Sequence, residues 1–129
     1  MLHIPGLFIS ESEERGRGVF TGHPLSPEDI IEVCPLILLE AKDVSKVHET
    51  VLHDYYFVYP AAEGMACIAL GYGSLYNHSS NPNADVDFDL DQQQIQIRCL
   101  RPIAAGEEVL IDYANGEEGK TLWFTPQGD

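Results

Sequence analysis

The chain has 129 residues, the length of one domain, and a domain of about this size buries roughly two thirds of the surface that its unfolded chain exposes. Hydrophobic residues make up 44% and charged residues 22% of the chain, and no segment approaches the run of about 20 apolar residues that a membrane helix needs, so we expect no membrane partner. Seven basic and 21 acidic residues give a formal net charge of −14, which argues against direct binding to nucleic acid and favours basic partners, although solubility alone also explains such a charge.

The N-terminal residues lack both the basic start and the unbroken apolar stretch of a signal peptide. We therefore expect a cytoplasmic or nuclear protein that is not secreted. The three cysteines, Cys34, Cys67 and Cys99, are isolated and form no C-x-x-C pair, so they offer neither a disulfide framework nor a zinc site. We expect three buried thiols and no bound metal.

No repeat or linker divides the sequence, so we expect one domain over residues 1–115 followed by a short tail over 116–129. In chain order, short apolar runs bounded by turn residues predict strands over 6–9, 19–20, 30–34, 36–39 and 67–70. One helix is predicted over 43–55, where the apolar residues that recur at helical spacing are Val44, Val47, Val51, Leu52 and Tyr55.

A hairpin is predicted further along the chain. Residues 85–91 alternate aspartate with apolar side chains, residues 95–99 alternate apolar with polar ones, and the glutamines at 92–94 form the turn. The acidic face of this hairpin is either a solvated surface or a docking surface for a basic peptide. Residues 109–111 predict a last apolar strand, and many short strands with one helix indicate a mainly β fold of small sheets.

Three short segments carry distinctive polar patterns. Residues 77–83, Asn-His-Ser-Ser-Asn-Pro-Asn, follow an apolar stretch, and on composition alone they form a loop whose side chains cap their own backbone. Residues 106–113, Gly-Glu-Glu-Val-Leu-Ile-Asp-Tyr, are by themselves a turn and a strand. Residues 16–20, Gly-Arg-Gly-Val-Phe, are consistent with a tight glycine turn.

Taken together and in this order, the three segments resemble the motifs of the SET-domain protein-lysine methyltransferases. Residues 77–83 resemble the family's Asn-His-Ser-x-x-Pro-Asn motif, residues 106–113 its Gly-Glu-Glu-Leu-x-x-Asp-Tyr motif, and residues 16–20 its Gly-x-Gly-x-Phe element. The resemblance extends over about 6–113, and the members closest in size are the compact, stand-alone viral and bacterial ones. It implies a SET fold with several small β-sheets, about one helix and a knot-like C-terminal crossing.

The resemblance also implies an activity, the transfer of methyl groups from S-adenosylmethionine to lysine side chains of a basic protein such as a histone or a histone-like protein. By this resemblance the cofactor contacts the main chain of Arg17, Gly18 and Val19. The side chain of Asn77 and the backbone at His78 complete the implied cofactor site. Gly18 has no Cβ and so lets the backbone approach the cofactor closely.

Tyrosines dominate the implied catalytic and channel residues. The hydroxyl of Tyr113 would orient the lysine amine, and Tyr55 is either a second channel tyrosine or a core residue. Of Tyr72 and Tyr76, we expect one to line a pocket and the other to pack. By the resemblance, the channel position that controls how many methyl groups are added is either Ile111 or a spatially adjacent one at about Val86.

The chain departs from larger family members in two places. Ser80 stands where many members have cysteine, and no Cys-rich segment follows Tyr113, so we expect the lysine channel to close without zinc. Trp123 and Phe124 are candidates to cover the site, with an exposed tail or a dimer contact as alternatives, and a homodimer stays open.

Two other functions fit the same sequence. One is a SET-fold module that binds basic proteins with little or no turnover, and the other is an acidic adaptor that holds no cofactor. The presence of Tyr113, Asn77 and His78 favours an active enzyme.

Overall fold

A computed structural model describes residues 3–112, so Tyr113, Trp123, Phe124 and the predicted tail lie outside the described residues. In chain order the elements are β1 (Leu7–Ser12), β2 (Gly16–Thr21), β3 (Ile30–Leu39), α1 (Ala41–His48), η1 (Val51–Asp54), β4 (Tyr56–Val58), β5 (Ala66–Ala69), η2 (Gly73–Leu75), β6 (Asn77–His78), β7 (Ala84–Asp89), β8 (Gln94–Cys99) and β9 (Leu110–Ile111), where η marks a 3-10 helix. The mainly β fold with one α-helix is confirmed.

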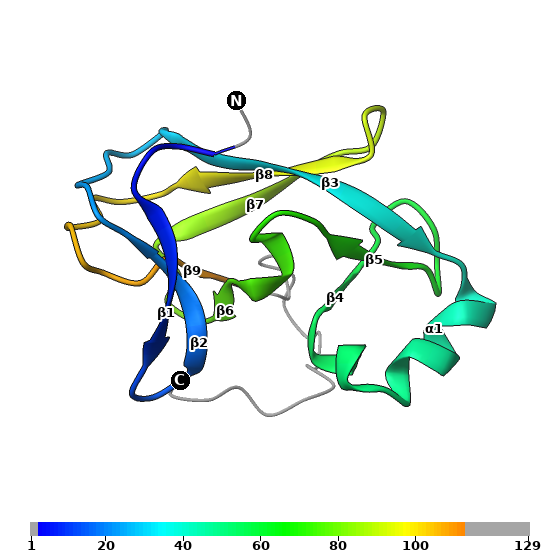
Figure 1. The fold of residues 1–129 in the computed structure, drawn as a ribbon. Helices are drawn as coiled ribbons and strands as arrows, with labels where there is room; N and C mark the ends of the chain where they lie inside the picture. Colours follow the sequence, from blue (N-terminus) through cyan, green and yellow to red (C-terminus); the bar gives the residue numbers. More distant parts are fainter. Residues whose placement is uncertain (1–2, 113–129) are drawn as a thin grey trace.

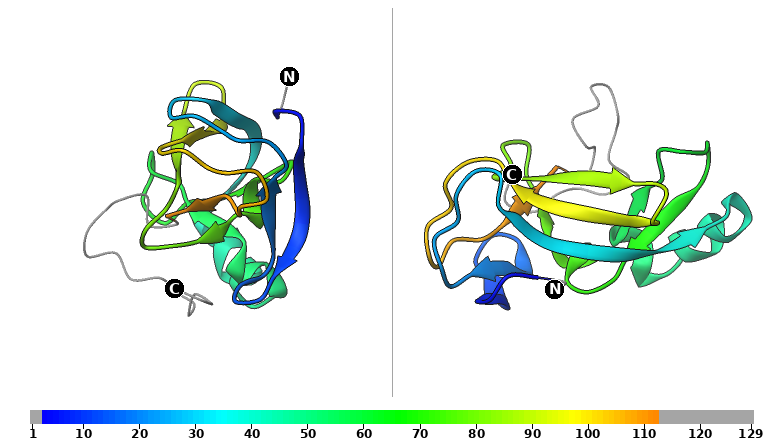
Figure 2. Two further views of the ribbon diagram at one scale, coloured as in Figure 1. Left: turned by 90° about the vertical axis from the view of Figure 1, so that its left-hand side faces the viewer. Right: turned by 90° about the horizontal axis from the view of Figure 1, so that it is seen from above.

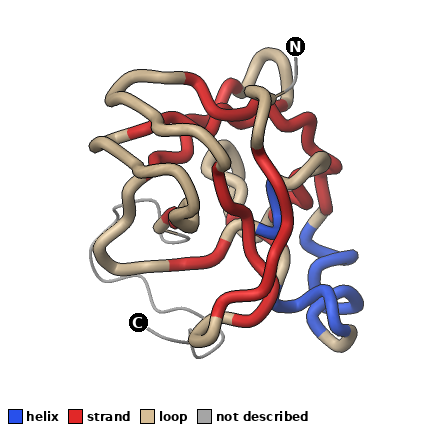
Figure 3. Tube along the Cα trace, turned by 60° about the vertical axis from the view of Figure 1, so that its left-hand side comes forward, coloured by secondary structure: helices blue, strands red, loops and turns tan. Residues whose placement is uncertain are grey.

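The described strands form three sheets (Figure 1). A five-stranded sheet has the order β4-β5-β3-β8-β7, the hairpin β1-β2 lies at one side of it, and β6 pairs with β9. Figure 3 shows most of the helical turns, in blue, at one edge of the molecule, and in Figure 1 α1 lies away from β6 and β9. The predicted acidic hairpin is β7-β8, paired antiparallel from Ala84 and Cys99 to Asp89 and Gln94.

One long strand, β3, replaces the two strands that the sequence predicted on either side of Pro35. Residues up to Pro35 pair with β8, and residues from Leu36 onward pair with β5. Pro35 therefore stands where β3 changes its partner, and its carbonyl still accepts a hydrogen bond from the Leu70 N–H at 2.9 Å. A proline is tolerated there because its missing N–H does not interrupt a continuous ladder.

The predicted helix over 43–55 is wrong in its second half. α1 ends at His48, and η1 begins only at Val51. The cause is Thr50, whose hydroxyl donates to the Val47 carbonyl at 2.6 Å and accepts from the Leu52 N–H at 3.1 Å. Such side-chain bonds compete with the helical backbone pattern, and they leave Val51 74% exposed.

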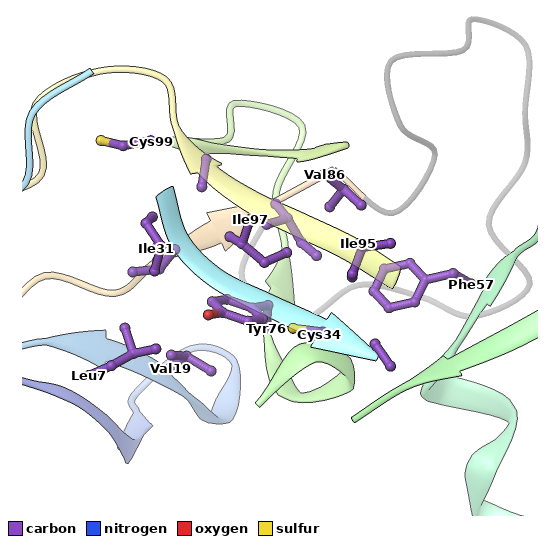
Figure 4. Packing of buried hydrophobic residues seen from close by; sticks show 14 of the residues in the cluster. Leu7, Val19, Ile31, Cys34, Phe57, Tyr76, Val86, Ile95, Ile97 and Cys99 are labelled. Carbon is purple, nitrogen blue, oxygen red and sulfur yellow. The ribbon is translucent and has the colours of Figure 1, made fainter. Parts of the chain in front are cut away.

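The core lies between the sheets, and Figure 4 shows its central side chains. It includes all three cysteines, which are buried and free as predicted. Burial raises the pKa of Cys67 to about 12, and burial together with nearby Glu32 raises the pKa of Cys34 as well. No helix within residues 3–112 is long and apolar enough to cross a membrane.

We expect the three thiols to be inert in the native protein, because only the thiolate reacts and burial disfavours it. Ellman's reagent at pH 8 should label the native protein slowly and should titrate three thiols at once after unfolding in guanidinium. Rapid labelling of all three thiols in the native protein would contradict this packing.

Candidate functional site

A short parallel pairing brings two of the sequence motifs together. Asn77 and His78 of β6 pair with Leu110 and Ile111 of β9, and the Ser79 N–H donates to the Ile111 carbonyl at 2.8 Å. Figures 1 and 2 show the two short strands side by side between the β1-β2 hairpin and the large sheet. The sequence position of Tyr113 comes two residues after this pair.

Asn83 fixes the same pairing with its side chain. The residue is buried, its Nδ2 donates to the Glu108 carbonyl at 2.9 Å, and its Oδ1 accepts from the Leu110 N–H at 2.8 Å. The Asn83 N–H also donates to the Leu110 carbonyl at 3.2 Å. Asn83 therefore completes the hydrogen bonding of the segment that enters β9.

The glycine element of β2 lies against the same segment. The Val109 N–H donates to the Val19 carbonyl at 2.8 Å, and the Gly106 N–H donates to the Thr21 carbonyl at 2.7 Å. The Thr21 N–H donates in turn to the Glu107 carbonyl at 3.2 Å. All three motifs predicted from the sequence thus meet in one place.

The two motif glycines serve different purposes. Gly16 has φ 73° at the start of β2, which fits the turn explanation. Gly18 is buried within β2, and a Cβ there would lie 2.6 Å from Asn77 Nδ2 and would also collide with the Glu108 carboxylate. A Cβ at this position would require the Asn77 and Glu108 side chains to shift from their present places.

Asn77 joins the motifs through its amide. Its Nδ2 donates to the Arg17 carbonyl at 3.0 Å and to Glu108 Oε2 at 2.7 Å. Burial raises the pKa of Glu108, and the hydrogen bond from Asn77 and the positive charge of Arg15 lower it in part. A carbonyl oxygen and a carboxyl oxygen therefore converge on the Asn77 amide beside Gly18.

His78 lies next to this point. Its side chain is 9% exposed, and its Nδ1 lies 3.7 Å from Oδ1 of Asp112. This contact ties the second residue of the Asn-His-Ser motif to the residue that precedes Tyr113 in the sequence.

The remaining predicted tyrosines lie in different surroundings. Tyr76 is fully buried among the core side chains (Figure 4), and its hydroxyl donates to Glu32 Oε1 at 2.7 Å. Tyr72 is half-buried, its ring stacks on that of His3 at 5.5 Å, and its N–H donates to Glu32 Oε2 at 3.0 Å. Burial and the charge of Glu32 raise the pKa of Tyr76 well above its usual value, so it stays a donor.

Tyr55 and Ile111 also have defined places. Tyr55 follows η1 and is half-buried, and Ile111 is fully buried in β9. Their catalytic and channel roles stay predictions, as do those of Tyr72 and Tyr76.

Glu32, Asn83 and Glu108 were missed as individual site residues. Asn83 and Glu108 lie inside recognised motifs, so a residue-by-residue comparison of side-chain chemistry could have singled them out. Glu32 gave one signal, a carboxylate within an apolar strand pattern. Within residues 3–112, no cluster of three or more His, Cys, Asp or Glu side chains could hold a metal ion.

Comparison with known proteins identifies the family. The family model described as the SET domain matches residues 16–114. The chain belongs to the SET-domain family of protein-lysine methyltransferases. This SET protein is 34% identical over 119 residues to a Schizosaccharomyces pombe protein named histone-lysine N-methyltransferase, H3 lysine-37 specific, with 92% of this chain and 76% of the relative aligned.

A solved structure shares the fold of this SET protein. It is the crystal structure of a Plasmodium falciparum protein that carries the description histone methyltransferase. The two chains are 28% identical with a TM-score of 0.70, and the match covers 89% of this chain and 97% of the other.

We expect Asn83→Ala to destabilise this SET protein, because it leaves the Leu110 N–H and the Glu108 carbonyl without the Asn83 side chain. Each buried group that is left unpaired costs about 1–3 kcal/mol. Urea unfolding measures the change in the free energy of unfolding.

Asn81→Ala is the matched control, since Asn81 is exposed and bonds to Ser79 and Arg101 through its main chain. It should change the free energy of unfolding by less than about 0.5 kcal/mol. Equal stability of the two variants would contradict the role of Asn83.

Proposed function

We propose that this SET protein transfers methyl groups from S-adenosylmethionine to the side-chain amine of lysine in a histone. The observation that carries the proposal is the convergence of the three motif segments on Asn77. The names of the yeast relative and of the Plasmodium protein support a histone as the substrate. With a histone as substrate, we expect the protein to act in the nucleus, or in the cytoplasm on newly made histones.

The residues around Asn77 fit the amino-acid end of S-adenosylmethionine, which supplies a methyl group on a positively charged sulfur. Hydrogen-bonding groups gather there at the Arg17 carbonyl and the Asn77 side chain, and Gly18 keeps the space clear of a Cβ. We assign Arg17, Gly18 and Val19 to cofactor binding through their main chain, with the Asn77 side chain and the His78 backbone.

Methyl transfer to lysine requires little acid–base catalysis by the protein. The amine must arrive without its extra proton, and burial in an apolar channel lowers the pKa of an amine. Tyr113, with its hydroxyl, is assigned to hold the amine in line with the methyl group, and Tyr55 to the channel wall. Positioning of this kind contributes much of the rate of such displacements.

The charge of the chain suits a basic substrate. A net charge of −14 attracts a histone tail and raises the rate of encounter at low salt. The exposed Asp87 and Asp91 of the β7-β8 hairpin add to this field on one surface. A SET module that binds basic proteins without turnover would show the same attraction, so only a methyl-transfer assay separates the two functions.

We expect Tyr113→Phe to abolish or greatly reduce methyl transfer to histones, because the lysine amine loses the hydroxyl that orients it. The measurement is incorporation of labelled methyl groups from S-adenosylmethionine into core histones, with mass spectrometry to locate the modified lysine. A thermal melt verifies that the variant is folded.

Two outcomes would contradict this assignment. A folded Tyr113→Phe variant with parental turnover would remove Tyr113 from catalysis. A parent protein that binds S-adenosylmethionine but methylates no basic protein would favour the binding module.

We also expect the enzyme to add two or three methyl groups to its lysine. A channel tyrosine that anchors a water restricts SET enzymes to one methyl group, whereas Ile111 and the neighbouring candidate position, Val86, carry no hydroxyl. Both side chains are buried and apolar, which leaves an alkylated amine in compatible surroundings. The mass of the product peptide after long incubation with excess enzyme measures the degree of methylation, and accumulation of monomethyllysine alone would contradict the expectation.

A further inference from the structure

A hollow lies at the end of the β7-β8 hairpin, away from the β6-β9 pair. Its volume is about 480 Å³, and its lining residues come from the last part of β7, the turn and one position of β8: Asp87, Phe88, Asp89, Leu90, Asp91 and Gln96. β7 is the last strand on its side of the described sheet, so no strand within residues 3–112 pairs with its outer side. In Figures 1 and 2 the turn of this hairpin lies at the opposite end of the strands from β9.

The lining of the hollow combines negative charge with apolar surface. Phe88 is half-buried, and its ring packs edge-on against the ring of Tyr59 with the centroids 6.3 Å apart, so its position is held from below. Leu90 is 45% exposed. Apolar surface beside carboxylates suits a lysine or arginine side chain, because its aliphatic stem packs on apolar groups while its charged head bonds to acceptors.

Two of the carboxylates have no partner in the described part of the chain. Arg98 of β8 forms an ion pair with Asp85, one step before the hollow on the same face of β7. Asp87 and Asp91 are exposed, and neither forms an ion pair or a side-chain hydrogen bond within residues 3–112. Their negative charges repel each other, and a bound cation relieves that repulsion.

The hollow is separate from the proposed site of methyl transfer. Asn83, which bonds to β9, directly precedes the start of β7, whereas Asp89 ends the same strand. A rise of about 3.3 Å per residue puts the hollow roughly 15 Å from the β6-β9 pair. An extended substrate chain spans that distance in about five residues.

We propose that this hollow binds a lysine or arginine side chain of the histone substrate, about five or more residues away from the lysine that is methylated. This inference rests on the proposed function for the identity of the substrate, but the hollow takes no part in the transfer itself. A histone segment held at both points has a higher effective concentration at the active site than one held at a single point. Segments that lack the second basic residue are then poorer substrates.

A labelled synthetic peptide of alternating arginine and alanine tests the hollow without turnover, because the peptide contains no lysine. We expect its affinity at low salt, measured by fluorescence anisotropy, to fall about fivefold in the double variant that combines Asp87→Asn with Asp91→Asn. The matched control combines Glu13→Gln with Glu28→Gln, which removes the same charge from exposed side chains outside the hollow, and it should bind within about twofold of the parent. Leu90→Ser keeps every charge and should weaken binding about threefold, because the arginine stem loses apolar surface.

Methyl transfer to core histones gives a second measurement. We expect the aspartate double variant to raise KM several-fold and to leave kcat within about twofold of the parent, because the hollow is remote from the transferred methyl group. In NMR spectra of the parent, the arginine peptide should shift the backbone amide signals of residues 87–91. A thermal melt verifies that each variant is folded.

The outcomes separate this inference from the proposed function. If the aspartate double variant binds the arginine peptide as the control does, or methylates histones with the parental KM, the docking role is wrong and the proposed function stands. If the parent methylates no histone yet binds the peptide through residues 87–91, the proposed function is wrong and the hollow is a binding surface of a SET module. Sedimentation of the parent alone detects another occupant, since a dimer that the aspartate double variant loses would assign the hollow to a second copy of the chain and overturn the proposal.

Discussion

The parallel pairing of β6 with β9 is the constraint on which the rest of the site depends. Two residues from each strand meet although about thirty residues separate them in sequence, and closing such a loop costs chain entropy. Asn83 and the buried side chain of Ile111 offset that cost. With the pair in place, Val109 bonds to β2 and Glu108 bonds to Asn77, so the three motif segments lie together.

Glu32 supports this pairing from the other side of the core. Its register against β8 shifts between Ile30 and Glu32, an irregularity that leaves both Ile31 and Glu32 buried. The carboxylate then bonds the Tyr76 hydroxyl and the Tyr72 N–H, the two ends of the segment that leads into β6. Burying a carboxylate costs free energy unless it is hydrogen-bonded. The bonds from Tyr76 and Tyr72 offset this cost, and they also fix the segment that leads to Asn77.

The sequence predicted the features that depend on local pattern, and it missed those that depend on tertiary contact. Alternation predicted the β7-β8 hairpin because one face of that hairpin is buried, although the turn lies at 90–93 and Gln94 already belongs to β8. Alternation failed at Glu32, where the register shifts. Helical spacing failed at Thr50, whose side chain ends a helix that the apolar pattern continued. The meeting of the motifs followed from family resemblance alone. Nothing local distinguishes Glu107 from Glu108, since one closes a turn and the other faces Asn77 only after β9 has paired.

The aspartates of β7 have a further consequence that concerns neighbouring molecules. In the described sheet β7 is an edge strand, and an exposed edge can extend by pairing with a strand of another chain. Three aspartates, Asp85, Asp87 and Asp89, place negative charges along that edge. One of them, Asp85, forms an ion pair with Arg98 of β8, with Nη2 and Oδ2 3.2 Å apart. Two identical edges would bring these charges together and repel. The aspartates therefore protect the edge of the sheet against pairing with a second copy of itself.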